Sequence, residues 1–435
     1  MSTPEEKAND ALESERKRYP NVAKKPDTAE QFGRFYQLDK DWFIRSAAPF
    51  AEPKQWPDPA DKIKLGFVMD NATGIAHGSN LFKLLQCLND YPQGFESVVF
   101  SKEPADDAFK EQLSGAEHIC FRSDSEVRCW IQLRTLARRN NITALIFVSV
   151  VPGIIFTKTI NAAPVVIWWS QKWHTLHLDG LGLIDTTHPF RPQQMLGLSD
   201  NKRLWRCARQ SMPRLFNPDA TEFALKMRDD VKKALDHGTI FGWLGRGDKL
   251  YDGYFCDSIC QILKAVPNSC FLWTAEKEGH QFGSYIDAAG LADRHKCIGW
   301  IDTSVFSQVI DIGLDSFPFG MGHTGYQLWE AGKPVIGVAN ENPGNLNTMF
   351  QLLEEGPPDL IDEANKLITV KPYCETVVDF IDLAIRLAAD KELQKQMGQE
   401  GNLFIDTFMR DDKAFAETFA YAVKQIIEEQ KDEQT

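Results

Sequence analysis

The chain has 435 residues, of which 43% are hydrophobic and 25% charged, and its formal net charge is −13 at pH 7. This length and apolar content suffice for two ordinary hydrophobic cores, so we expect two domains. The acidic balance and the lack of a sustained basic run exclude a typical duplex-DNA binder, which needs a basic face to neutralise phosphates.

Cellular location is indicated by three features of the composition. No stretch reaches the roughly 18 consecutive apolar residues that cross a bilayer, and the charged N-terminus has no apolar signal-peptide segment. The nine cysteines are spread from Cys87 to Cys374, which is typical of reduced thiols rather than of a disulfide framework. Cys256 and Cys260 are four residues apart, but no second Cys or His pair with metal-ligand spacing accompanies them. We therefore expect a cytoplasmic protein without membrane insertion.

The two ends of the chain are expected to lie outside the main domains. Residues 1–60 are rich in charged residues and proline and hold few apolar side chains, so they cannot form a core. We predict a mobile or loosely docked extension that ends in a proline-rich connector. Residues 411–435 are expected to form a C-terminal helix and tail.

The first domain is predicted over residues 61–236, where β-branched and aromatic runs alternate with helix-like segments. This alternation is typical of a doubly wound parallel sheet. The first strand, Lys62 to Met69, leads into a polar, glycine-containing loop that follows Asp70 and includes His77. Because open α/β sheets bind ligands at the carboxyl ends of their strands, this loop is a candidate site, although a loop histidine can also be merely solvated.

A second polar loop follows the strand-like run 165–169 and contains Gln171, His174 and His177. We interpret it as a loop for acceptor binding or acid–base chemistry. Metal ligation is the less favoured interpretation, because no suitably placed carboxylate or third histidine accompanies the two histidines.

The second domain is predicted over residues 237–410, after an amphipathic helix at 218–236 that leads out of the first domain. Its first strand, at 239–244, is followed directly by a glycine-flanked turn with Arg246 and Lys249. Arginine can hold phosphate oxygens through two hydrogen bonds, and lysine neutralises them as a point charge. A solvated surface turn is the alternative.

The most informative stretch runs from Leu314 to Val338. A buried strand is followed by the loop 320–325, which holds three glycines, a histidine and a threonine, and then by a helix-like run at 326–331. Backbone N–H groups at a helix N-terminus bind anions, most often phosphate, although a glycine-rich turn can also serve tight packing. A Rossmann dinucleotide site would carry its glycine fingerprint after the first strand and an acidic residue about 20 positions on, and this pattern is not present.

These residues resemble the GT-B-fold glycosyltransferases, and within them glycosyltransferase family 41, which includes O-linked N-acetylglucosamine transferases and bacterial cytoplasmic adhesin N-glucosyltransferases. The resemblance runs from about Lys62 to Ala422 and omits the helical-repeat region of better-known members. It is carried by the run 314–334, by Lys249 and by the segment 163–177. It implies an α/β protein of two doubly wound, Rossmann-like domains that face each other across a cleft.

The resemblance also implies roles for single residues. In the family, the loop histidine and threonine hydrogen-bond the nucleotide phosphates and a lysine neutralises the leaving diphosphate, which here implies His323, Thr324 and Lys249. Gln171 and His174 are implied on the acceptor side of the cleft. Because the residues that follow the parallel strands of the second domain meet at one edge of its sheet, we add Arg246, Glu276 and Trp300 to this site. The predicted nucleotide-sugar-binding set is Arg246, Lys249, Glu276, Trp300, Gly322, His323, Thr324, Gly325, Gln327 and Glu330.

Two positions depart from the family pattern. Family members usually have two threonines after the histidine, whereas this chain has one, and the expected ribose-binding aspartate is replaced by Gln327. Glutamine can hydrogen-bond a ribose diol, but without the charge-assisted strength of a carboxylate. Glu330, one turn further on, is a candidate substitute.

The expected chemistry is an inverting, metal-independent transfer of a hexose or N-acetylhexosamine from a UDP-sugar to a protein, peptide or glycan, without a further cofactor. Preorganised donors stabilise the negative charge that grows on the departing diphosphate. His77 and His177 are candidates for the base that takes the acceptor proton, with Asp70 behind them. Retaining GT-B enzymes often have two glutamates eight positions apart, and the corresponding residues here are Phe319 and Gln327, which favours inversion.

A catalytically silent GT-B-fold module that only binds sugar nucleotides is the alternative, motivated by Gln327. A sugar-nucleotide epimerase of the same fold is less favoured, because it needs catalytic carboxylates that we cannot place. No nucleic-acid partner is expected, and the sequence leaves the sugar, the acceptor and the oligomeric state open.

Overall fold

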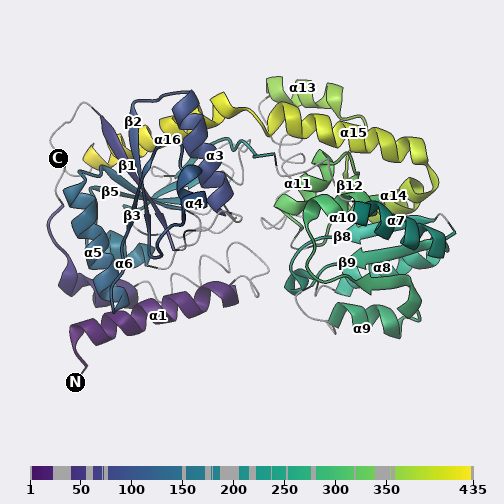
Figure 1. The fold of residues 1–435 in the computed structure, drawn as a ribbon, viewed down its shortest axis with the longest axis horizontal. Helices are drawn as coiled ribbons and strands as arrows, with labels where there is room; N and C mark the ends of the chain where they lie inside the picture. Colours follow the sequence, from purple (N-terminus) through teal and green to yellow (C-terminus); the bar gives the residue numbers. More distant parts are fainter. Residues whose placement is uncertain are drawn as a thin grey trace. The chain divides into compact units, whose positions relative to one another are not determined.

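The structure is a computed structural model that describes residues 2–22, 41–54, 62–70, 72, 77–148, 153–171, 178, 180–186, 205–214, 222–236, 238–250, 253–275, 281–317, 320–338, 353 and 358–432. The chain divides into two compact units (Figure 1). The first unit comprises Met1–Pro213 and Asp411–Thr435, and the second comprises Arg214–Arg410. Each unit is built on one parallel β-sheet, which confirms the predicted fold class.

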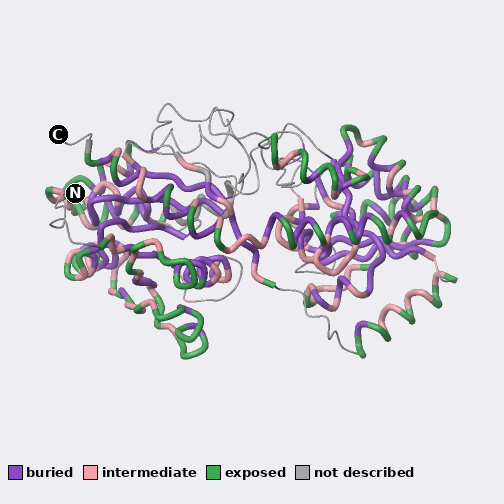
Figure 2. The backbone as a smooth tube through the Cα atoms, turned by 90° about the horizontal axis from the view of Figure 1, so that it is seen from above, coloured by how far each residue is buried: buried purple, intermediate pink, exposed green. Residues whose placement is uncertain are grey.

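The sheet of the first unit has, in the described residues, seven strands in the order β3-β2-β1-β4-β5-β6-β7, with all neighbours parallel. The central strands β4 and β5 are buried along their whole length. Figure 2 shows such buried segments in purple in the interior of each unit. Helices cover both faces of such a sheet, which explains why these strands read as continuous apolar runs. The strands are β1 (Ile63–Met69), β2 (Phe95–Ser101), β3 (Glu117–Cys120), β4 (Ala144–Val148), β5 (Val165–Ser170), β6 (Gly182–Asp185) and β7 (Trp205–Cys207).

The helices of the first unit follow the strands in the expected alternation. Two of them begin at side-chain caps, where Asp106 and Ser125 accept hydrogen bonds from the backbone N–H groups of Phe109 and Arg128. Such caps satisfy N–H groups that have no partner in the first helical turn. The helices are α1 (Pro4–Val22), α3 (His77–Asp90), α4 (Asp107–Glu111), α5 (Glu126–Arg139), α6 (Ile154–Thr159) and α16 (Asp412–Asp432), with a 3-10 turn at Ala48–Phe50.

The helix α16 comes last in the sequence, yet it completes the core of the first unit (yellow, Figure 1). Phe415, Phe419 and Ile426 are fully buried in the hydrophobic cluster that also contains residues of β1, β4 and β5. The ring of Phe419 lies 5.1 Å from the ring of Trp169, centroid to centroid, in an edge-to-face arrangement. This geometry is favourable for aromatic pairs.

The N-terminal extension differs from our expectation of a mobile or loosely docked segment over its first part. The helix α1 contacts α5, and it buries Ala8, Ala11 and Leu12, which are spaced as one stripe of a helix. The Asn9 side chain accepts a hydrogen bond at 3.2 Å from the backbone N–H of Val127, at the start of α5. Small apolar residues in a highly charged sequence concealed this docking face.

The sheet of the second unit has, within the residues that the structure describes, six strands in the order β10-β9-β8-β11-β12-β13, again all parallel. The strands are β8 (Thr239–Trp243), β9 (Ser269–Trp273), β10 (His295–Cys297), β11 (Ile312–Leu314), β12 (Val335–Val338) and β13 (Tyr373–Cys374). The helices are α7 (Glu222–Ala234), α8 (Gly253–Ala265), α9 (Gln281–Ala288), α10 (Thr303–Val309), α11 (His323–Glu330), α13 (Pro358–Leu367), α14 (Val377–Ala389) and α15 (Lys391–Phe408), with 3-10 turns η4 (Gly247–Lys249) and η5 (Ala292–Arg294). Within the described part of the chain, no helix is both long and apolar enough to cross a membrane.

The helix α7 packs on the second unit, whereas we expected it to close the first domain at residue 236. The Arg228 guanidinium donates hydrogen bonds to carbonyl groups at the end of α10 and, at 2.6 Å, to the carboxylate of Asp311. Lys232 forms an ion pair with the same carboxylate. The division between the units therefore follows Pro213.

We expect Phe419→Ala to lower the free energy of unfolding of the first unit by about 3–5 kcal/mol, because it removes a fully buried ring and leaves a cavity beside Trp169. Denaturant unfolding followed by tryptophan fluorescence measures the loss. Tyr421→Ala is the matched control, because this side chain lies on the same helix and is 63% exposed. Its effect should stay within about 0.5 kcal/mol. Equal losses for the two variants would contradict the packing of α16 in this core.

Candidate functional site

Two segments that the sequence singled out meet at the carboxyl ends of β8 and β11. The Lys249 ammonium group, in the turn η4 after β8, donates a hydrogen bond at 2.6 Å to the backbone carbonyl of Gly320. The structure therefore joins the cationic turn to the glycine-rich loop 320–325, as parallel strands require of segments that follow their carboxyl ends.

The loop 320–325 is held in place by contacts with the end of β8. The Thr324 hydroxyl lies 2.7 Å from the carbonyl of Leu244 and 3.0 Å from that of Met321, and it donates to these backbone oxygens. The family resemblance implied phosphate binding for this hydroxyl, and in the structure it fastens the loop. Gly322 has φ +66°, a left-handed conformation that glycine adopts without strain, and it directs the chain into α11.

Asp315 lies directly behind this loop, as the first residue after β11. Its carboxylate accepts a hydrogen bond from the backbone N–H of Met321. A Cβ atom at Gly320 would lie only 2.5 Å from a carboxylate oxygen of Asp315, so a larger residue there would displace this carboxylate. Burial raises the pKa of Asp315 to about 6, although the Met321 N–H and the charge of Lys249 act in the opposite direction.

His323 begins α11 and is half-buried. Burial lowers the pKa of its imidazole to about 4, and the positive charge of Lys249 acts in the same direction. The ring is therefore neutral at pH 7. It can donate one N–H hydrogen bond to an anion, but it adds no charge.

Further side chains tie the strand ends of the second sheet together. The indole N–H of Trp243 donates to the hydroxyl of Ser316 at 2.9 Å, which links β8 to the segment after β11. The backbone N–H of Gly245 donates at 2.9 Å to the hydroxyl of Thr274, which follows β9. The sequence predicted no role of their own for Asp315, Ser316 and Thr274, although each is a polar residue within two positions of the end of a buried strand.

Glu330, our candidate substitute for the ribose-binding aspartate, already has partners within the second unit. Its carboxylate forms an ion pair with Arg410, and its backbone carbonyl accepts a hydrogen bond from Asn402 at 2.6 Å. It lies seven residues after His323, or about 10 Å further along the helix axis. The arginine neutralises the carboxylate, so Glu330 fastens α11 to the last residues of the second unit.

The other predicted nucleotide-side residues differ in exposure. Gln327 is half-buried and lies one helical turn after His323, so both occupy the same side of α11. Arg246 is exposed beside the turn η4, and Trp300 is 67% exposed after β10. Glu276 lies outside the described residues.

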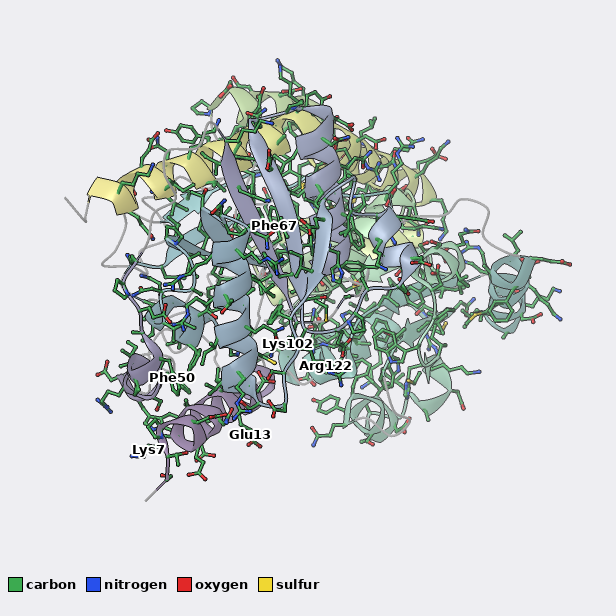
Figure 3. All side chains as sticks on the ribbon, turned by 60° about the vertical axis from the view of Figure 1, so that its left-hand side comes forward. Lys7, Glu13, Phe50, Phe67, Lys102 and Arg122 are labelled. Atoms are coloured by element: carbon green, nitrogen blue, oxygen red, sulfur yellow. The ribbon has the colours of Figure 1, made fainter. Side chains whose placement is uncertain are left out.

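At the carboxyl end of the first sheet, the ammonium group of Lys102 lies between two carboxylates. It is 3.1 Å from Asp70 and 2.7 Å from Glu126, and it lies 4.4 Å from the centre of the Trp130 ring. The backbone carbonyl of Lys102, which Figure 3 labels, accepts a hydrogen bond at 3.5 Å from the Sγ of Cys120, the last residue of β3. Asp70, our reserve candidate for the base, is thus already paired with a half-buried cation.

The histidines of the first unit are described only in part. His77 is the first residue of α3, but its side chain lies outside the description, as do His174 and His177 altogether. Gln171 is 5% exposed, and its side-chain carbonyl accepts a hydrogen bond at 2.8 Å from the amide of Asn80, which is buried in the first turns of α3. The pair links the two predicted polar loops.

No protein-family model matches the chain, and no curated protein matches it in sequence. Solved structures are similar to it. A variant of the O-GlcNAc transferase of Thermobaculum terrenum has a TM-score of 0.67 and 16% identity, over 92% of this chain and 75% of that chain. HepE of Anabaena in complex with UDP has a TM-score of 0.56 and 10% identity, over 83% of this chain and 100% of that chain. A glycosyltransferase of Rickettsia africae has a TM-score of 0.54 and 13% identity, over 85% and 99%. At such identities the likeness is one of fold, and it confirms that the chain has the GT-B fold.

We expect the stability of the second unit to fall as the pH drops from about 6.5 to about 4, because unfolded His323 binds a proton in this range and the buried ring does not. The difference in pKa corresponds to on the order of 3 kcal/mol. His323→Asn removes this contribution, so its unfolding midpoint should depend less steeply on pH than that of the wild type. Thermal unfolding between pH 4 and 7 measures it, and parallel curves for the two proteins would refute the assignment.

Proposed function

We propose that the protein is an inverting, metal-independent glycosyltransferase that moves a hexose or N-acetylhexosamine from a UDP-sugar to a protein side chain, a peptide or a glycan. The observation that carries this proposal is the contact of Lys249 with Gly320, 2.6 Å long, beside the start of α11. A cation and the N-terminus of a helix together favour a diphosphate. The similarity of fold to HepE of Anabaena, whose structure contains UDP, supports a nucleotide at this edge.

Departure of the diphosphate is the step that these residues would assist. When the bond from the anomeric carbon to the phosphate oxygen breaks, its electron pair stays on the oxygen and negative charge grows on the diphosphate. Lys249 would neutralise this charge, and the neutral His323 would donate one hydrogen bond to it. Groups that are held in position before the reaction stabilise such charge with little reorganisation, so the proposed mechanism needs no divalent metal.

The rest of the donor is assigned to the neighbouring strand ends. Trp300 offers an exposed indole face for stacking of the base, since aromatic side chains stack on nucleobases readily. Gln327 follows His323 by one helical turn and is proposed to hydrogen-bond the ribose, in place of Glu330, whose charge is paired with Arg410.

The acceptor is proposed to bind at the carboxyl end of the first sheet, where His77 or His177 would take its proton. The nucleophilic atom of the acceptor then attacks the anomeric carbon from the side opposite the diphosphate, which inverts the configuration. Asp70 is the weaker candidate, because its carboxylate is already engaged in an ion pair with Lys102. A cytoplasmic location is part of the proposal.

The second candidate function is binding of sugar nucleotides without turnover, which the replacement of the ribose-binding aspartate by Gln327 favours. The two functions are separated by incubating the purified protein with a panel of UDP- and GDP-sugars and measuring nucleotide release, with and without acceptors and with a chelator. Release of UDP that depends on an acceptor supports the transferase. Binding of UDP without release under any condition supports the module.

We expect Lys249→Ala to lower kcat about a hundredfold while changing the affinity for the intact donor much less, because the diphosphate charge that the lysine meets grows in the transition state. Loss of one such donor costs roughly 3 kcal/mol. Single-turnover kinetics and calorimetric titration with the intact donor, in the absence of acceptor, measure the two quantities.

The matched control for this variant is Lys264→Ala. Lys264 is exposed in the last turn of α8, within the same unit, and its loss removes an equal charge away from the site. Its kcat should stay within twofold of the wild type. A Lys249→Ala enzyme with wild-type kcat would exclude this lysine from the mechanism.

For the base, we expect one of the variants His77→Ala and His177→Ala to lose most transfer activity while UDP affinity stays near the wild-type value, since the base acts on the acceptor. Asp70→Asn should lose less, because its carboxylate is paired with Lys102. Initial rates and UDP titrations of the three variants give the comparison. Full activity in both histidine variants would exclude them as bases.

A further inference from the structure

The carboxylate of Asp315 lies beside the proposed phosphate site, where a negative charge is unfavourable. It lies directly behind the loop that is proposed to hold the diphosphate, and its own negative charge repels that ligand. Burial also disfavours its charged form, as the raised pKa of about 6 indicates. A neutral side chain at this position would make the second unit more stable and the site more positive.

The contacts of Asp315 indicate what its charge achieves. The carboxylate accepts the N–H of Met321 and packs flat against Gly320, whose carbonyl in turn receives the Lys249 ammonium group at 2.6 Å. The positive charge of Lys249 acts on the same carboxylate. Asp315 therefore holds the loop through a hydrogen bond and holds the lysine through its charge.

From these contacts we propose that Asp315 is the positioning residue that fixes Lys249 and the turn at Gly320–Met321 for the departing diphosphate. This inference rests on the proposed function and deepens it. Asp315 does not touch the substrate; it sets where the ammonium group lies before the bond breaks. A displacement of such a group by about 1 Å can cost a hundredfold in rate.

The charged groups that face Asp315 from the elements around it are few in the described part of the second unit. The turn η4 contributes Lys249, whose positive charge acts on the carboxylate, while His323 at the start of α11 carries no charge at pH 7. The strand β12 approaches with the uncharged Gly337. Ionisation of Asp315 thus pairs one negative charge with the single positive charge of Lys249.

The test is Asp315→Asn, which keeps an oxygen that accepts the Met321 N–H but removes the charge. We expect kcat at pH 7.5 to fall at least tenfold, affinity for UDP to stay equal or to tighten, and the thermal unfolding midpoint to rise. The expected rise of the unfolding midpoint follows from the direction of the pKa shift of Asp315. Asp315 has a higher pKa folded than unfolded, so its contribution to stability is full below about pH 3.8, declines as the pH rises to about 6, and is absent at pH 7.5.

Asp311→Asn is the matched control, because Asp311 flanks the other end of β11. Its pKa is lowered, since the ion pairs with Lys232 and Arg228 outweigh its burial. We expect the opposite result there: a lower unfolding midpoint at pH 7.5, and an unchanged kcat at temperatures where the protein stays folded.

The dependence of kcat on pH is a further test, because a purely structural role of Asp315 would leave this dependence unchanged. Below about pH 6 the wild-type kcat should fall as Asp315 takes up a proton, whereas Asp315→Asn should not show this step. The titration of UDP itself is common to both proteins and cancels in the comparison.

Each outcome tests either the proposed function or the positioning role of Asp315. A wild-type protein that neither binds UDP nor releases it from a sugar donor overturns the proposed function, and the positioning role with it. Wild-type turnover with an equally active Asp315→Asn overturns the positioning role alone. A variant that is both less active and less stable at pH 7.5 overturns it as well, because the residue would then be a structural support.

Discussion

The constraint on which the rest of the structure depends is that every strand pair in both sheets is parallel. Parallel strands need a crossover between them, and their carboxyl ends reach the same edge of the sheet. The segments after β8, β9 and β11 therefore meet, although they are separated in sequence by the helices between them. The contact of Lys249 with Gly320 joins two such segments across 71 positions of the chain.

Much of the fold and part of the site could be predicted from the sequence, because the signals are local. Buried strands such as 144–148 and 165–170 are continuous apolar runs, and a glycine-rich turn before a helix marks an anion loop wherever it occurs. Parallel topology then suffices to bring Lys249 near the loop. What could not be predicted depends on which distant residue a side chain meets. Arg410, two residues beyond the end of α15, neutralises Glu330, and nothing in the sequence around Glu330 signals that partner.

The packing partners of two helices, α7 and α1, were not predicted for the same reason. The periodicity of α7 shows that one of its faces is buried, but not which sheet buries it, and that choice is made by the ion pairs of Arg228 and Lys232 with Asp311. The helix α1 has an apolar stripe made mostly of alanine, which contributes little to a hydrophobicity count. Its docking depends instead on shape and on hydrogen bonds to the start of α5, among them the bond accepted by Asn9.

The packing of α16 on the first unit has a consequence for folding during synthesis on the ribosome. Residues 214–410 are contiguous, so the second unit can fold as soon as they leave the exit tunnel. The sheet of the first unit is synthesised earlier, yet the side of Phe67 and Trp169 that Phe419 covers stays open until residues 412–432 emerge. The unit that is synthesised first therefore completes its core last. During that interval its apolar face is exposed, and such surface on a nascent chain is prone to aggregation and is protected by chaperones.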